Sequence, residues 1–167
     1  MQRARAVRLA IFDVDGVMTD GTLFIGAQGE AFKAFNIQDG HGVKMLQAAG
    51  IATAIISGRS SESVLRRAAE LHVAHVVQGS SDKARSFDEL IASLGVEANA
   101  CAFMGDDLPD LPVLRRCGFA VAVANACDAV KSAAHYVTRA SGGKGAVREF
   151  CDLVLRAQGR AESEAAL

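Results

Sequence analysis

Short runs of apolar residues alternate along this chain with longer segments whose apolar positions recur at helical spacing. The runs predict strands at residues 7–12, 51–56, 73–77, 101–104, 119–123 and 136–137. The periodic segments predict helices at residues 41–49, 60–71, 82–94, 109–116, 127–134 and 145–156. Because single helices separate successive strands, we expect parallel pairing through right-handed crossovers. The pattern therefore predicts an α/β fold, a doubly wound, Rossmann-like parallel sheet sandwich.

One early segment departs from this alternation. Residues 22–25 and 30–35 flank the sequence Gly26-Ala27-Gln28-Gly29, which is typical of a β-hairpin with a glycine-containing loop. We expect a single domain over residues 1–156 and a frayed tail at 157–167, where Ala, Glu and Ser dominate.

Charge and hydropathy exclude several classes of partner. Eighteen Lys and Arg oppose nineteen Asp and Glu, so no global basic field favours nucleic acid or an anionic membrane. The apolar runs are far shorter than the roughly 20 residues that cross a bilayer. The apolar stretch after Arg8 is too short for a signal peptide, so we expect a cytoplasmic protein. Four widely spaced cysteines with apolar neighbours favour buried, reduced thiols.

Acidic residues end the first predicted strand, in the sequence Asp13-Val14-Asp15-Gly16. Side chains two apart on a strand face the same way, so both carboxylates can converge on one site. Paired carboxylates repel unless a cation or a shared proton compensates, and Mg²⁺ takes oxygen ligands. The alternative is that both residues only cap the following turn.

Polar residues also follow the next strand and begin a later helix. Ser57-Gly58-Arg59 offers a hydroxyl and free amides just before a helix, which suits an anion. Lys83 stands at a helix start, where a cation is unfavourable unless it serves a nearby anion. Taken singly, Ser57 is equally explained as the start of a turn, and Lys83 as a solvated surface lysine.

A second acidic cluster follows the strand at 101–104. Asp106, Asp107 and Asp110 lie within five residues of one another, which favours a divalent-cation site. Helix capping is the competing explanation, but a cap needs only one acid.

The order of these motifs resembles the haloacid dehalogenase (HAD) superfamily of phosphotransferases. The resemblance implies that Asp13 is the nucleophile, forming an aspartyl-phosphate, and that Asp15 is the general acid/base. It implies three groups that hold the phosphoryl oxygens: Ser57, Gly58 and Lys83. It also implies Mg²⁺ bound by Asp13, by the backbone carbonyl of Asp15 and by Asp106, with Asp107 and Asp110 as supports.

Segment lengths and details narrow the resemblance to a capless branch. Residues 17–56 and 59–82 are too few for a cap domain, so a neighbouring subunit is expected to close the site. Four segments resemble the family of 3-deoxy-D-manno-octulosonate 8-phosphate phosphatases: residues 13–21, 36–42, 56–59 and 142–149. That family implies lipopolysaccharide biosynthesis and a homotetramer with hairpins at its centre. Arg59 is an implied substrate contact, since a guanidinium can clamp a sugar-acid carboxylate. Gly145 is the other, because in that family the C-terminal region folds over the site.

Two alternatives stay open on the sequence. Phosphatases of nonulosonate 9-phosphates share most motifs but tend to carry Glu at the position of Arg59. A non-enzymatic phosphoacceptor domain would also use a doubly wound sheet, an Asp and Mg²⁺. Its lysine would follow a late strand, whereas Lys83 precedes the acidic cluster at 106–110.

Overall fold

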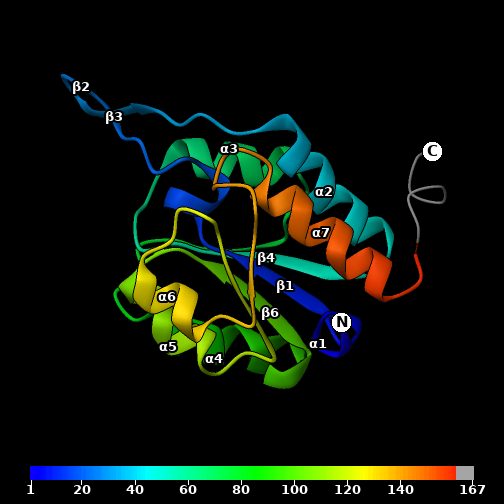
Figure 1. The fold of residues 1–167 in the computed structure, drawn as a ribbon. Helices are drawn as coiled ribbons and strands as arrows, with labels where there is room; N and C mark the ends of the chain where they lie inside the picture. The colour runs from blue at the N-terminus through cyan, green and yellow to red at the C-terminus, as the bar shows by residue number, and fades with distance from the viewer. Residues whose placement is uncertain (161–167) are drawn as a thin grey trace.

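The computed structural model describes residues 1–160 and contains one six-stranded parallel sheet (Figure 1). The strand order is β5-β4-β1-β6-β7-β8, and every pairing is parallel. The strands are β1 (Leu9–Phe12), β4 (Ala52–Ile56), β5 (His75–Val77), β6 (Cys101–Gly105), β7 (Phe119–Ala122) and β8 (Tyr136–Val137). The doubly wound α/β prediction is confirmed.

Helices cover both faces of the sheet. Helices α2 (Ile37–Ala48), α3 (Glu62–Glu70) and α7 (Ala146–Ala157) lie above it in Figure 1, with α2 and α7 side by side. Helices α4 (Lys83–Leu94), α5 (Leu111–Leu114) and α6 (Asp128–Ala133) lie below it. A short helix α1 (Gln2–Arg5), which the sequence pattern did not predict, precedes β1.

Strand β1 occupies the middle of the sheet, and all four of its residues are buried. A strand covered on both faces is expected to be apolar throughout, as this one is. Its last residue, Phe12, meets Phe150 of α7 edge to face, with ring centroids 5.9 Å apart. The carboxyl end of β1 is thus held rigidly where the acidic sequence at 13–15 begins.

Helix α2 begins four residues earlier than the predicted start at residue 41. The Asn36 side chain accepts a hydrogen bond from the Asp39 N–H and so caps the helix. This cap and the packing of α2 against α7 outweigh the low helix propensity of Gly40 and Gly42.

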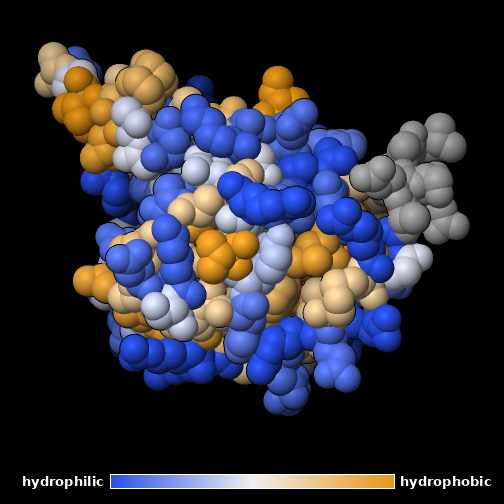
Figure 2. Space-filling model, in the orientation of Figure 1, coloured by the Kyte–Doolittle hydropathy of each residue, from blue (hydrophilic) through white to orange (hydrophobic). Residues whose placement is uncertain are grey.

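Strands β2 (Phe24–Gly26) and β3 (Gly29–Phe32) form the predicted hairpin, which projects from the body of the protein (Figure 1). Its apolar side chains lie exposed, and Figure 2 shows hydrophobic colouring gathered on it: Leu23, Phe24, Ile25 and Phe32. Between β1 and β4 lie only a helical turn at Val14–Met18, this hairpin and α2, and between β4 and α4 lie only α3 and β5. The capless prediction is therefore confirmed for the described residues.

The C-terminal helix ends at Ala157, and the Gln158 side chain donates to the carbonyl of Val7. The predicted frayed tail lies, from residue 161 onward, outside the described residues. Cys101, Cys117 and Cys151 are buried free thiols, as expected. Among residues 1–160, no helix has both the length and the apolar character needed to span a membrane.

Two leucines of different burial give a test of how the core stabilises the fold. Leu46→Ala, at a fully buried position of α2, is expected to lower the free energy of unfolding by about 2–5 kcal/mol, because it leaves a cavity. The matched change Leu65→Ala, at a half-exposed position of α3, should cost less than about 1 kcal/mol. Urea unfolding of both variants checks this difference, and equal losses would contradict it.

Candidate active site

A cavity of about 600 Å³ opens at the carboxyl ends of the central strands, where ligands of open α/β sheets bind. It is lined by all of the predicted site residues except Gly145: Asp13, Asp15, Ser57, Gly58, Arg59, Lys83, Asp106, Asp107 and Asp110. The four sequence motifs therefore meet in one place, although they are spread over almost a hundred residues of chain.

Lys83 is the buried cation of this cavity. Its Nζ lies 2.9 Å from Asp13 Oδ1 and 2.7 Å from Asp110 Oδ1. Its side chain is only 6% exposed, so the alternative of a solvated surface lysine is wrong. Asp82 caps α4 by accepting from the Arg85 N–H, which starts the helix in a position that aims Lys83 at the two carboxylates.

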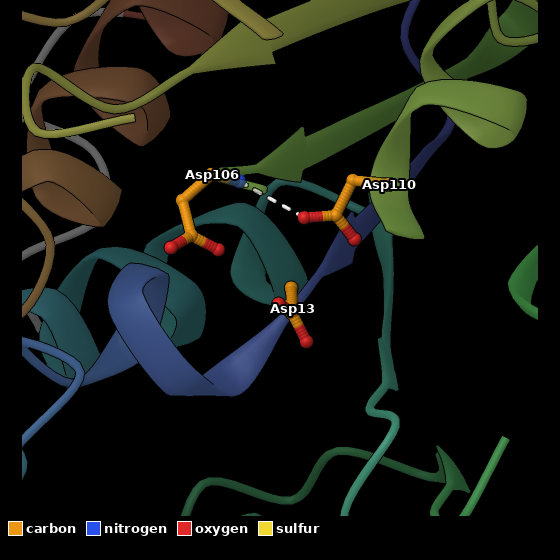
Figure 3. A group of neighbouring side chains, drawn as sticks. All are labelled: Asp13, Asp106 and Asp110. Atoms are coloured by element: carbon orange, nitrogen blue, oxygen red, sulfur yellow. Dashed lines mark hydrogen bonds between the residues drawn. The ribbon is translucent and has the colours of Figure 1, made fainter. Parts of the chain in front are cut away.

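Asp110 organises the acidic loop after β6. Its Oδ2 accepts a hydrogen bond from the Asp106 N–H at 2.9 Å (Figure 3). Oδ2 also accepts from the Asp107 N–H at 3.2 Å, while Oδ1 accepts from Lys83. Asp107 is exposed and caps the turn by accepting from the Leu108 N–H. The acidic loop thus contains a capping residue, Asp107, as well as residues of the site. Asp106 is the acid of this loop that faces Asp13.

Burial and mutual repulsion disfavour the ionised forms of the carboxyl groups in the cavity. Burial, reinforced by Asp110 and opposed by Lys83, raises the pKa of Asp13 to about 7. Burial, together with the charge of Asp13, likewise raises the pKa of Asp106 to about 7. For Lys83, burial acts to lower the pKa, but the carboxylates of Asp13 and Asp110 outweigh it, and the net shift is upward.

The donor set fits a hard divalent cation. Asp13, Asp106 and Asp110 each offer an oxygen within 4.8 Å of the others, and one ammonium does not neutralise three carboxylates (Figure 3). Both oxygens of Asp110 already accept hydrogen bonds. Asp13 and Asp106 are therefore the carboxylates best placed to bind the ion.

The turn after β1 requires glycine at position 16. Gly16 has φ of +89°, and a Cβ there would lie 2.1 Å from Asp106 Oδ2. The absence of a side chain lets the two acidic loops approach each other.

A second loop buttresses this turn, and sequence reasoning missed the residue that joins them. Asn125 accepts from the Gly142 N–H at 2.7 Å and donates to the Gly16 carbonyl at 3.4 Å. Only its place after strand β7 could have indicated a role. Through Asn125, the glycine-rich loop at 142–145 braces the backbone that carries Asp15.

Asp15 has basic neighbours that the sequence pattern also did not reveal. Lys33, which follows β3, pairs with Asp15 Oδ1, and Arg59 Nε lies 3.8 Å from Asp15 Oδ2. Arg59 is half exposed at the cavity and also lies near Glu30 of β3. Lys33 and Glu30 looked like ordinary polar positions of a hairpin.

Ser57 and Gly145 have contrasting positions. The Ser57 side chain is buried at the cavity and accepts from the Arg59 N–H at 3.3 Å, so it serves the turn as well. The Gly145 N–H instead donates to Asp39 Oδ2 at 3.3 Å, and the Arg148 N–H donates to Asp39 Oδ1 at 2.8 Å. Within one chain, Gly145 begins α7 and does not line the cavity, because Asp39 holds it against α2.

The fold and the site together define a class of protein, the haloacid dehalogenase-like hydrolases. Its marks here are the parallel sheet, the paired acids at 13 and 15, the buried lysine and the acidic loop. A family model of that description matches residues 71–150. These residues include Lys83 and the acidic loop at 106–110.

Similar proteins indicate which family of this class the chain resembles. The 3-deoxy-D-manno-octulosonate 8-phosphate phosphatase KdsC of Yersinia pestis is 48% identical over 167 residues, covering 100% of this chain and 89% of the relative. A crystal structure of such a phosphatase from Moraxella catarrhalis, in complex with magnesium ion, phosphate ion and KDO, is 45% identical with a TM-score of 0.92, covering 95% of this chain and 91% of that one. The cobalt-bound enzyme of Haemophilus influenzae is 44% identical with a TM-score of 0.93, covering 95% and 92%.

The chain belongs to the family of 3-deoxy-D-manno-octulosonate 8-phosphate phosphatases. It is therefore a phosphoric monoester hydrolase.

The close approach of the two acidic loops gives a test of the metal site. Gly16→Ala is expected to weaken Mg²⁺ binding at least about tenfold, because the new Cβ displaces Asp106. Gly95→Ala is the matched control, since Gly95 also has positive φ but meets nothing within 4 Å. Isothermal titration with Mg²⁺ compares them, and equal affinities would contradict the steric argument.

Proposed function

We propose that this chain hydrolyses 3-deoxy-D-manno-octulosonate 8-phosphate to the free sugar acid and phosphate, in lipopolysaccharide biosynthesis. One observation carries the proposal: Asp13, Lys83, Asp106 and Asp110 converge in a single cavity. The same catalytic chemistry is expected of relatives 45–48% identical over nearly the whole chain.

Asp13 is the proposed nucleophile. Its carboxylate oxygen attacks phosphorus, forming an oxygen–phosphorus bond of an acyl phosphate (aspartyl-phosphate) as the bond between phosphorus and the sugar oxygen breaks. Lys83, buried beside Asp13, offsets negative charge on the transferring phosphoryl oxygens, and Ser57 with the Gly58 amide supplies further donors. Lys83 also holds Asp13 in place in the free enzyme.

Asp15 is the proposed general acid and base. It gives its proton to the departing sugar oxygen and then takes a proton from water, whose oxygen attacks phosphorus and releases phosphate from Asp13. The second step restores both carboxyl groups to their starting states. Arg59, half exposed at the cavity, is the proposed contact for the carboxylate of the sugar acid.

Mg²⁺ is the cofactor, and Asp13, Asp106 and the backbone carbonyl of Asp15 are its proposed ligands, with Asp107 and Asp110 as supports. When bound, the ion neutralises charge on the phosphoryl group. The surplus of carboxylate over ammonium in the cavity supports this assignment.

Turnover of two substrates tests the function. With Mg²⁺, phosphate release from the octulosonate 8-phosphate should exceed that from a nonulosonate 9-phosphate, because Arg59 replaces the Glu typical of the nine-carbon branch.

Asp13→Asn should lower turnover by at least about 10³-fold while keeping the fold, because the volume is unchanged and the nucleophile is lost. Preference for the nine-carbon acid would overturn the substrate, and near-normal activity of Asp13→Asn would overturn the mechanism.

We also propose that the protein is a cytoplasmic homotetramer with its hairpins packed at the centre. A two-stranded hairpin is marginally stable alone, and an exposed apolar patch of this kind marks an interface. Gly145, in the loop whose residues 142–143 contact the turn after β1, stays a candidate substrate contact.

The oligomeric state tests the hairpin interface. The double variant Ile25→Glu/Phe32→Glu should reduce the particle mass from four chains to fewer, because it places charges in an apolar contact. Light scattering after size exclusion measures the mass. Leu65→Glu, at an exposed apolar position of α3, is the control and should stay tetrameric. A double variant that keeps the mass of four chains would overturn the central position of the hairpins.

A further inference from the structure

Lys33 is a buried charged residue that the proposed chemistry does not use. It follows strand β3 of the hairpin, yet its side chain is only 2% exposed. Burying an ammonium group is costly unless carboxylates pair with it. Lys33 has two such partners, Asp15 Oδ1 and Glu30 Oε2, the latter 3.0 Å away.

The two carboxylate oxygens of Asp15 have different contacts. Oδ1 is engaged by Lys33, which is not among the residues lining the cavity. The ion pair of Oδ2 among residues 1–160 is a longer one, with Arg59 Nε 3.8 Å away. The carboxyl group is therefore oriented by one oxygen, and the other remains available on the cavity side.

Lys33 is in turn held in place by Glu30. Glu30 of β3 pairs with its ammonium group and also accepts a hydrogen bond from the Ser61 hydroxyl, at the start of α3. Hairpin, helix α3 and the Asp15 turn are thus joined by one chain of polar contacts. Because two carboxylates hold its ammonium group, the Lys33 side chain has already lost most of its rotamer freedom. Orienting Asp15 during turnover therefore requires little further ordering.

We propose that Lys33 is a positioning residue for the proton transfers of Asp15, and that Glu30 holds Lys33 in place. The inference rests on the proposed acid/base function of Asp15. In this role Lys33 acts through Asp15.

The experiment compares two leaving groups in the Mg²⁺-loaded enzyme. A sugar alkoxide needs a proton to leave, whereas p-nitrophenolate is a weak base that leaves without one. Lys33→Met should lower kcat/KM for the octulosonate 8-phosphate by about 10²-fold, and for p-nitrophenyl phosphate by less than about threefold. This ratio is informative because general damage to the fold would lower both values together.

Asp15→Asn separates the inference from the function on which it rests. It should show the same selective loss, and adding Lys33→Met to it should not change the ratio further. If Asp15→Asn itself lacks selectivity, the acid role of Asp15 fails. If Asp15→Asn is selective but Lys33→Met lowers both substrates equally, or the two changes add, the positioning role of Lys33 is overturned.

Two further variants keep the test sharp. Glu30→Gln preserves volume and should produce a smaller loss with the same selectivity, even if Lys33→Met proves too unstable to assay. Equal losses on both substrates in Glu30→Gln would count against the proposal. Lys44→Met, at an exposed lysine of α2, should leave both kcat/KM values unchanged.

Discussion

The ion pairs of Lys83 with Asp13 and Asp110 are the constraint on which the rest of the site depends. One ammonium lies between two nearly inaccessible carboxylates, so removing it would leave both charges buried and repelling each other. The same pairs tie α4 to the ends of β1 and β6. Asp106 adds a further carboxylate, so one ammonium group does not balance the negative charge of the three acids. A divalent cation supplies the missing positive charge.

Close backbone packing brings these charges together. The turn at Gly16 lies against Asp106 on one side and against Gly142 on the other, where a Cβ on Gly142 would come within 1.8 Å of the Gly16 carbonyl. Asn125 then bonds both loops. The loops after β1, β6 and β8 are thus closely packed, and the Asp106 and Asn125 side chains make contacts between them. A rigid frame of this kind keeps the acids at fixed separations before any ligand binds.

Much of the fold and the central site could be predicted because local patterns encode them. Buried strands are apolar throughout, and DxDG, Ser-Gly-Arg, Lys83 and the loop at 106–110 each follow a strand or begin a helix. The residues that pattern analysis missed act over long sequence separations. Lys33 reaches Asp15 from a hairpin, and Asn125 reaches Gly16 across the sheet. Nothing in their neighbours' sequence signals these contacts. Gly145 illustrates the reverse case, since Asp39 holds it away from the cavity of its own chain.

The hairpin joins the two parts of the molecule that a sequence pattern treats as unrelated, the apolar surface and the catalytic acid. It carries the stacked, exposed Phe24 and Phe32, and it also carries Glu30, with Lys33 following directly after β3. Burying the Lys33 ion pairs contributes little net stability, because desolvation offsets most of the Coulombic attraction. Contacts of that kind persist where they fix a geometry rather than where they stabilise a core. Through Lys33 and Glu30, the hairpin that carries the apolar surface therefore also contacts the carboxyl group of Asp15.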